Sequence, residues 1–288
     1  MMKHYYQIAG HCLKISGELL CQAIEQIVGF APFRMQDSDE AVLEFMMAET
    51  GDVPTFEEVQ YTLAYEDVEG SFGIVSDKVY MLCLAPEGRD SLYMWADVEQ
   101  GKVYLKGNQE VYLLRFALWV GFGLLTCFQN TVAIHSSCIV YNGKAVLFLG
   151  ESGTGKSTHT RLWREHIEGA MLLNDDSPIL RVEDGKVWAY GSPWSGKTPC
   201  YKNQRVELAG CVRLSQAPHN RMKRLSVLQG YGALHPSCPP EFAYDDLLYD
   251  GVSQVIGGIL SVVPVYHLEC LPDKDAAELS CRTIFGWA

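Results

Sequence analysis

The stretch KAVLFLGESGTGKSTHTRLWREHI, residues 144–167, decides the architecture of the second half of the chain. It begins with a short apolar run typical of a buried strand and ends with a segment that suits a helix. Between them, GESGTGKS at residues 150–157 matches the pattern G-x-x-x-x-G-K-[ST]. Such a loop needs a strand before it and a helix after it, because backbone N–H groups of the loop and the helix start must converge on an anion. The sequence therefore predicts a phosphate-binding loop here.

This loop predicts ATP and Mg²⁺ as cofactors. Its glycines can adopt positive φ and let phosphate groups approach closely. We expect Lys156 to reach the β- and γ-phosphates and the Ser157 hydroxyl to ligate Mg²⁺. The predicted nucleotide-binding residues are Gly150, Glu151, Ser152, Gly153, Thr154, Gly155, Lys156, Ser157 and Thr158.

A second stretch, GSPWSGKT at residues 191–198, matches the same pattern but lacks its context. Pro193 removes a backbone donor, and a strand-like segment rather than a helix follows Thr198. We expect a surface turn, or a loop at the substrate side of the first site with Trp194 offering an apolar surface. In the second case Lys197 is a candidate catalytic residue that meets the transferred phosphoryl group, and Lys197→Ala leaves ATP affinity within a few-fold.

Two acids follow the predicted loop helix in LLNDD, residues 172–176. Adjacent side chains on an extended segment point to opposite sides, so one carboxylate can face a metal ion and the other an acceptor. We assign Asp176, with Ser157, to Mg²⁺ and Asp175 to the catalytic base, and the reverse assignment stays open. His135, expected in a strand just before the loop strand, is a further catalytic candidate, although such a histidine is more often structural.

The first part of the chain predicts a β-rich domain over residues 1–108, followed by a domain over residues 109–288. Short runs rich in β-branched and aromatic residues, such as EVQYTLAY and KVYMLCLA, are separated by turn signals such as EGS and PEGRD. The apolar run VYLLRFALWVGFGLLTCF, residues 111–128, has only about the minimum length of a membrane span and contains Arg115. We interpret it as a buried helix, and the fold class as α+β.

Composition narrows the classes of partner and the compartment. The 288 residues carry a net charge of −12, which disfavours a nucleic-acid partner because such proteins usually present a basic face. Ten cysteines show no Cys-x-x-Cys pair and no zinc-finger spacing, which indicates reduced thiols in the cytoplasm. No run near the N-terminus is long and apolar enough for a signal peptide, and we expect no membrane partner.

The segment AIHSSCIVYNGKAVLFLGESGTGKST followed by LLNDD resembles the catalytic domain of bacterial HPr kinase/phosphorylase and of HPr-kinase-like serine kinases. The wider superfamily includes phosphoenolpyruvate carboxykinase. The resemblance covers residues 111–288 and is most specific over residues 135–176. It implies phosphorylation of a serine, with His135 and the pair Asp175 and Asp176 matching the family's histidine and its Asp-Asp pair. It also implies a strand-rich core around the phosphate loop.

Alternatives for the function remain open from sequence. The leading expectation is an ATP-dependent kinase whose acceptor is a protein, a peptide or a small molecule with a hydroxyl group. The second is a catalytically silent nucleotide-binding regulator or peptide-binding adaptor. The third is carboxykinase chemistry, which the short chain and the lack of a recognisable Lys/His manganese site disfavour. HPr kinase itself forms oligomers, so a homo-oligomer is also open.

Overall fold

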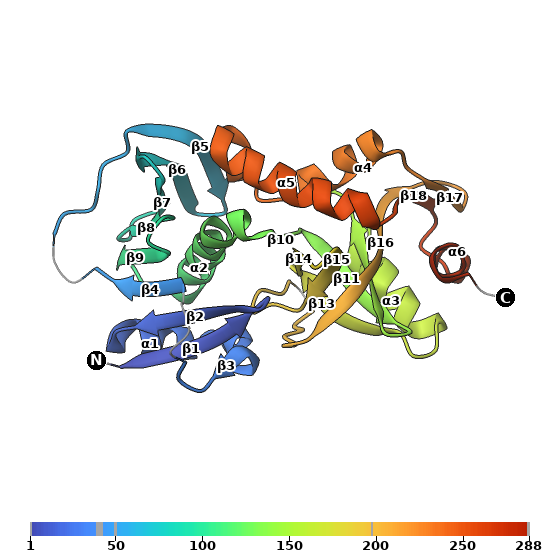
Figure 1. Ribbon diagram of the computed structural model, residues 1–288, viewed down its shortest axis with the longest axis horizontal. Helices are drawn as coiled ribbons and strands as arrows, with labels where there is room; N and C mark the ends of the chain where they lie inside the picture. The colour runs from blue at the N-terminus through green and yellow to red at the C-terminus, as the bar shows by residue number, and fades with distance from the viewer. Residues whose placement is uncertain (1, 39–42, 49–50, 197, 287–288) are drawn as a thin grey trace. The chain divides into compact units, whose positions relative to one another are not determined.

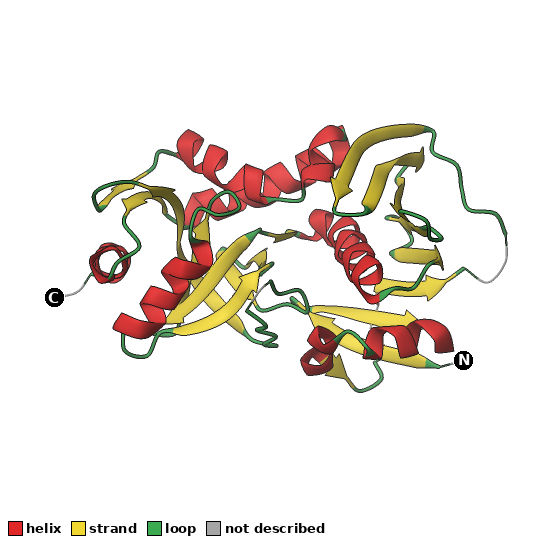
Figure 2. Ribbon diagram, turned by 180° about the vertical axis from the view of Figure 1, so that it is seen from behind, coloured by secondary structure: helices red, strands yellow, loops and turns green. Residues whose placement is uncertain are grey.

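A computed structural model describes residues 2–38, 43–48, 51–196 and 198–286. The fold is mixed α and β with two large sheets, in line with the expected α+β class (Figures 1 and 2). The chain forms two compact units, Met1–Gln129 with Glu241–Tyr249, and Asn130–Pro240 with Asp250–Ala288. The expected boundary at residues 108/109 would place the apolar helix in the second domain, whereas this division places it in the first unit.

The first unit is built on a sheet of nine strands among the described residues, in the order β3-β1-β2-β4-β9-β8-β7-β6-β5. Its strands are β1 (Lys3–Ile8), β2 (His11–Ser16), β3 (Arg34–Met35), β4 (Leu43–Met47), β5 (Glu58–Tyr65), β6 (Val68–Ser76), β7 (Val79–Pro86), β8 (Leu92–Asp97) and β9 (Lys102–Gly107). Its helices are α1 (Glu18–Glu25), α2 (Val111–Thr126) and the 3₁₀ turns η1 (Val28–Phe33), η2 (Cys127–Gln129) and η4 (Pro240–Tyr244).

Strand β6 corrects one expectation from the sequence. The segment EGS was interpreted as a turn, but it lies inside β6, which pairs with both β5 and β7. The glycine of that segment, Gly70, allows close packing inside the sheet, because a Cβ there would lie 2.7 Å from Cγ of Leu63 in β5.

Helix α2 confirms the expectation of a buried helix. The segment Val111–Gln129 is long and apolar enough to cross a membrane, with a mean hydropathy of 1.8, yet 67% of it is buried within the protein. Within the first unit, Gly121 of α2 lies against Phe45 of β4 and Val103 of β9. A helix in the core of a domain has the same high hydropathy, and most of α2 is buried, as expected for a core helix.

The second unit holds the other nine-stranded sheet of the described chain, in the order β10-β14-β15-β16-β12-β11-β13, with β18 beside β16 and β17 beside β18. Its strands are β10 (Thr131–Ala133), β11 (Ser136–Tyr141), β12 (Lys144–Leu149), β13 (Met171–Asp176), β14 (Ile179–Glu183), β15 (Lys186–Tyr190), β16 (Arg205–Gln216), β17 (Arg221–Arg224) and β18 (Val265–Cys270). Its helices are α3 (Lys156–His166), α4 (Val227–Leu234), the 3₁₀ turn η3 (His235–Ser237), α6 (Lys274–Phe285) and the later part of α5 (Asp246–Val262), within which the division between the units falls.

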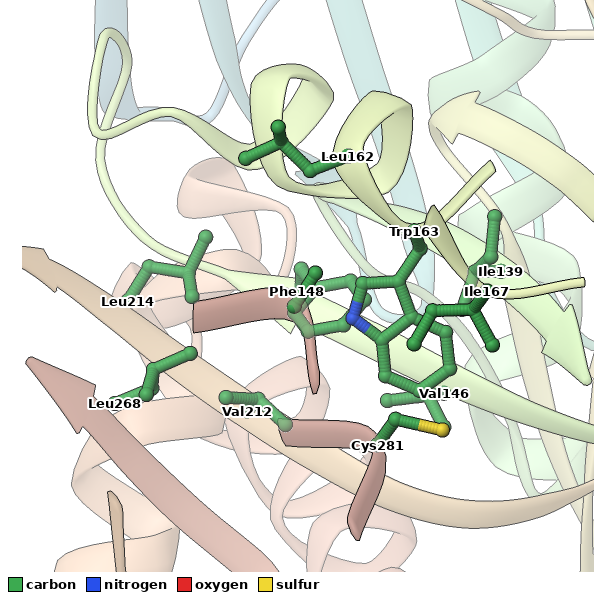
Figure 3. Close-up of a cluster of buried hydrophobic side chains, with 11 residues drawn as sticks. Ile139, Val146, Phe148, Leu162, Trp163, Ile167, Val212, Leu214, Leu268 and Cys281 are labelled. Atoms are coloured by element: carbon green, nitrogen blue, oxygen red, sulfur yellow. The ribbon is translucent and has the colours of Figure 1, made fainter. Parts of the chain in front are cut away.

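A buried cluster joins one face of this sheet to α3 and α6 (Figure 3). Phe148 of β12 and Val212 of β16 meet Trp163 of α3 and Cys281 of α6, and all four are fully buried. The Trp163 indole N–H donates to Ser280 Oγ of α6 at 2.9 Å, which satisfies its one polar atom inside the core. This packing fixes α3 against β12, and therefore fixes the loop that joins them.

Candidate phosphate-binding and catalytic site

The predicted phosphate loop lies between β12 and α3, as the sequence indicated. Gly150, Gly153 and Gly155 have φ values of 148°, 81° and 101°, a region that favours glycine. Gly155 is the N-cap of α3, and no side chain caps this helix start. The first-turn N–H groups are therefore available to an anion, which the positive end of the helix dipole also attracts.

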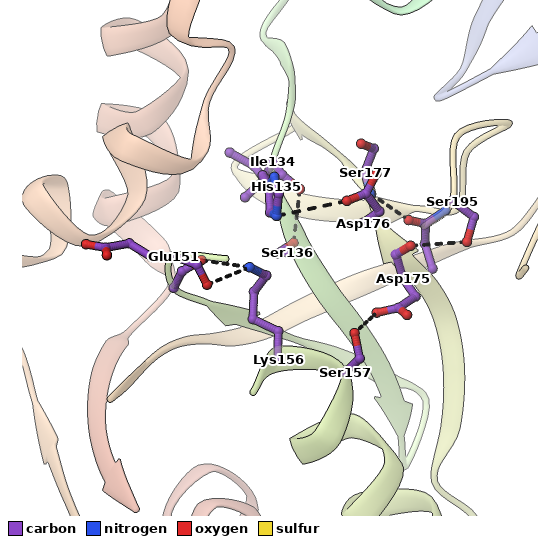
Figure 4. Close-up of polar contacts among 12 residues, drawn as sticks. Ile134, His135, Ser136, Glu151, Lys156, Ser157, Asp175, Asp176, Ser177 and Ser195 are labelled. Atoms are coloured by element: carbon purple, nitrogen blue, oxygen red, sulfur yellow. Dashed lines mark hydrogen bonds and ion pairs between the residues drawn. The ribbon is translucent and has the colours of Figure 1, made fainter. Parts of the chain in front are cut away.

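Lys156 is the first residue of α3, and its side chain lies over the loop. Its Nζ donates to the carbonyl oxygens of Gly150 at 2.8 Å and Glu151 at 3.2 Å (Figure 4). Partial burial lowers the pKa of Lys156, while the nearby carboxylates of Asp176 and Asp175 oppose this shift. An ammonium that has lost part of its hydration at a loop of N–H donors gains from a phosphate oxygen as partner.

Strand pairing brings the distant candidate residues to the same sheet edge as the loop. Strand β11 pairs antiparallel with both β12 and β13, with Ser137 opposite Phe148 on one side and Asp175 on the other. The start of β11 therefore lies beside the ends of β12 and β13. His135 comes directly before β11, in a bend after β10 rather than in the strand that we expected.

Asp175 faces the phosphate loop. The Ser157 hydroxyl donates to Asp175 Oδ1 at 2.9 Å, and the Asp175 residue is only 4% exposed (Figure 4). A hydroxyl and a carboxylate oxygen side by side at a phosphate loop are oxygen ligands of the kind that Mg²⁺ prefers. The sequence had paired Ser157 with Asp176 for this purpose, whereas the hydrogen bond links Ser157 to Asp175.

Asp176 points away from Asp175 and toward His135. Its Oδ1 lies 3.9 Å from His135 Nε2, and the side chains are 39% and 54% exposed. Its φ of 130° is rare for a residue other than glycine, and such backbone strain clusters at functional sites. Desolvation and the charge of Lys156 lower the pKa of His135, while the carboxylates of Asp176 and Asp175 oppose this shift. Asp176 is thus an accessible carboxylate beside a histidine.

The second pattern match lies directly beside the Asp pair. Strand β15 leads into it, and β16 follows at Arg205 with no helix among the described residues between them. Ser195 pairs with Asp176 as an isolated β-bridge, Ser195 Oγ donates to the Asp175 carbonyl at 3.1 Å, and the Gly196 N–H also donates to that carbonyl. The loop therefore borders the site.

Asn174 is a buried residue that the sequence analysis missed. Its side-chain amide donates to the carbonyl oxygen of Trp194 at 2.9 Å and to Ser192 Oγ at 3.3 Å, and its Oδ1 accepts from the Ser177 N–H at 2.9 Å. Asn174 is 0% exposed. A polar residue between Leu173 and the acids in an apolar strand was the available signal, because a buried amide needs such partners.

Two expectations for this second loop have different outcomes. Trp194 is only 3% exposed, so the proposed apolar surface for a substrate is wrong. The Asn174 amide holds the Trp194 carbonyl, and the indole is turned into the protein. Lys197 lies outside the described residues, and its catalytic role stays a prediction.

The donor set fits a Mg–nucleotide complex better than a self-contained metal centre. Among the described residues, no group of three or more His, Cys, Asp or Glu side chains is placed to hold a metal ion. Ser157 and Asp175, which are hydrogen-bonded to each other, would supply two oxygen ligands. Mg²⁺ is commonly held by one or two protein oxygens together with phosphate oxygens and water, so two ligands suffice.

Comparisons with known proteins add little to this geometry. No protein-family model matches the chain, and no curated protein sequence matches it. A solved structure of the Hpr(Ser) kinase/phosphatase from Coxiella burnetii is similar to part of it, with 13% sequence identity over 51% of this chain and 90% of that chain. The TM-score of 0.30 is too low for that likeness to assign a fold or a function.

Proposed function

We propose that the chain is an ATP- and Mg²⁺-dependent kinase that transfers the γ-phosphoryl group to a serine-type hydroxyl of a protein, a peptide or a small molecule. One observation carries the proposal: the Ser157 hydroxyl of an uncapped, glycine-rich phosphate loop is hydrogen-bonded to Asp175 at 2.9 Å, and the exposed carboxylate of Asp176 follows in the chain. A phosphate site, a metal-ligating pair and a proton acceptor are the parts that phosphoryl transfer requires.

Each residue of the site has a role in this proposal. Lys156 and the loop N–H groups hold the phosphates, while Ser157 and Asp175 hold Mg²⁺, which neutralises charge on the β- and γ-phosphate oxygens when bound. The hydrogen bond between Ser157 and Asp175 supports this choice over the assignment of Asp176 to the metal. The unit from Asn130 onward then corresponds to an HPr-kinase-like or carboxykinase-like phosphate-loop domain.

Asp176 receives the proton of the acceptor hydroxyl. As the acceptor oxygen bonds to the γ-phosphorus, the bond from that phosphorus to the β–γ bridging oxygen breaks, and ADP leaves. His135, whose Nε2 lies 3.9 Å from Asp176 Oδ1, acts as a positioning residue for this carboxylate. The exposure of both side chains supports direct approach of an acceptor to Asp176.

The remaining proposals concern location and partners. The structure records no disulfide among the ten cysteines, all of which it describes, and this supports a reducing cytoplasmic location. The net charge of −12 supports the expectation that nucleic acid is not a partner. The burial of α2 supports the expectation that a membrane is not a partner.

Phosphoryl transfer is tested directly with γ-labelled ATP. The protein, in excess over ATP and with Mg²⁺, is mixed with a peptide library randomised around a central serine and, separately, with free L-serine. We expect label on serine oxygen in at least one reaction, with serine-to-alanine peptides and the Lys156→Ala protein as controls. Bound ATP that stays intact, with neither transfer nor hydrolysis over hours, would instead favour a silent nucleotide-binding regulator.

A further inference from the structure

A cavity of about 600 Å³ opens beside the phosphate loop, on the side away from the Asp pair. The loop glycines Gly153 and Gly155 form one rim, and Thr158 and Leu162 of α3 form one wall. The ends of β16 and β18 form the opposite wall. This volume lies within the range of pockets that bury small organic ligands, about 300–1,000 Å³.

The first turns of α3 separate this cavity from the metal-ligating pair. Thr158 and Leu162 are four residues apart and therefore lie on one helix face, which lines the cavity. Ser157 belongs to a neighbouring face and bonds to Asp175. A ligand whose terminal phosphate lies at Ser157 and Asp175 can therefore extend across the first turn of α3 to the side of Thr158.

The cavity wall carries no formal charge at neutral pH among its described residues. Its lining combines uncharged polar residues with apolar side chains that include Leu214, Leu271 and Pro272. Burial lowers the pKa of His159 to about 4 and raises that of the Cys270 thiol to about 11, so both are neutral. Such a wall does not favour phosphate, but it suits a flat, uncharged aromatic group.

We infer that this cavity holds the nucleoside part of a nucleoside triphosphate, with the base between Leu162 and the segment at Leu271. The inference rests on the proposed function, since it requires the triphosphate to occupy the neighbouring loop. Gln216 links the two sites, because its side-chain Nε2 donates to the Gly153 carbonyl at 3.3 Å. The cavity then makes the protein selective for nucleotides over simple polyphosphates.

The test compares Mg·ATP with inorganic tripolyphosphate by calorimetry. Ala217 lines the cavity, and its backbone N–H bonds to the Cys270 carbonyl at 3.1 Å, so Ala217→Trp fills the cavity without removing that bond. We expect Ala217→Trp to weaken ATP binding at least about tenfold, because a base contributes mainly through buried ring area. Binding of tripolyphosphate should stay within about twofold. His219→Trp, two residues further along at an exposed position, is the matched control. It should change the affinity for neither ATP nor tripolyphosphate.

Three outcomes overturn the inference and one bears on the proposed function instead. ATP affinity within about twofold of wild type in both Ala217→Trp and a second cavity-filling variant, Leu271→Trp, would place the base elsewhere. An equal loss of affinity for ATP and for tripolyphosphate in both variants would show that the substitutions act on the phosphate loop. Wild-type protein that binds tripolyphosphate as tightly as ATP would remove the need for a base site. Wild-type protein that binds neither ligand would contradict the proposed function itself.

Discussion

Asp176→Asn is expected to bind Mg·ATP as the wild type does but to transfer the phosphoryl group about 10²–10⁴-fold more slowly, which is the usual contribution of a general base. The amide has nearly the shape of the carboxylate but cannot take up the acceptor proton. Asparagine also tolerates positive φ better than most residues, so the backbone of residue 176, at φ 130°, should be retained. Single-turnover transfer and calorimetric ATP binding, measured on the same preparation, check both halves of this expectation.

Asp175→Asn is the matched variant, because it makes the same chemical change one residue earlier. Its loss should appear in the Mg²⁺ dependence, since the Ser157 hydroxyl would face a neutral amide in place of Asp175 Oδ1. Titration of the transfer rate with Mg²⁺ should therefore require more metal to reach saturation. If the two phenotypes are exchanged, Asp175 is the base and Asp176 is the metal ligand. Full activity in both variants would contradict the proposed mechanism.

Lys156→Ala is expected to remove most of the affinity for Mg·ATP. The ammonium is held at the loop by the carbonyl oxygens of Gly150 and Glu151, and its replacement leaves the phosphates without their cationic partner. A ligand that binds only the native state stabilises it by RT ln(1 + [L]/Kd), about 2.7 kcal/mol at 100 times Kd. Wild type should therefore melt at a clearly higher temperature with Mg·ATP, and the variant should shift little.

Lys144→Ala is the control for this experiment, because Lys144 begins β12 and pairs with Glu207 at 3.5 Å on the surface. Its melting temperature should rise with Mg·ATP as that of wild type does. Equal shifts in wild type and Lys156→Ala would contradict the assignment of the phosphate loop. An equal loss of ATP binding in Lys156→Ala and Lys197→Ala would point to a second phosphate loop at residues 191–198.

The strand–loop–helix arrangement around residues 150–157 was predictable because its signal is local. An apolar strand, a glycine-rich turn and a helix follow one another in the chain, and β12, the loop and α3 occupy residues 144–166 without interruption. The Asn-Gly hairpin between β11 and β12 was predictable for the same reason, with Asn142 and Gly143 both at positive φ.

The arrangement around the Asp pair was only partly predictable, because it depends on contacts between distant segments. The pairing of Ser136 with Asp176 brings His135 to the end of β13, and sequence patterns do not specify such a register. The inward turn of Trp194 depends on Asn174, twenty residues earlier in the chain. Sequence periodicity showed that no helix follows the second loop, but not which way that loop would fold.

In the first unit, glycines misled the analysis for a physical reason. Glycine in a sequence favours a turn, yet in a strand it also allows a neighbouring strand to pack closely, as Gly70 does beside the Leu63 side chain. The two uses of glycine look alike until the partner strand is known. The segment EGS inside β6 was therefore interpreted as a turn.

A crystal structure with Mg²⁺ and a non-hydrolysable ATP analogue would show which loop holds the triphosphate and which residues hold the metal. We expect the triphosphate in the loop of residues 150–157, Mg²⁺ bound by Ser157 and Asp175, and the γ-phosphate on the side of Asp176. Triphosphate bound at residues 191–198, or Mg²⁺ bound without either Ser157 or Asp175, would contradict this expectation.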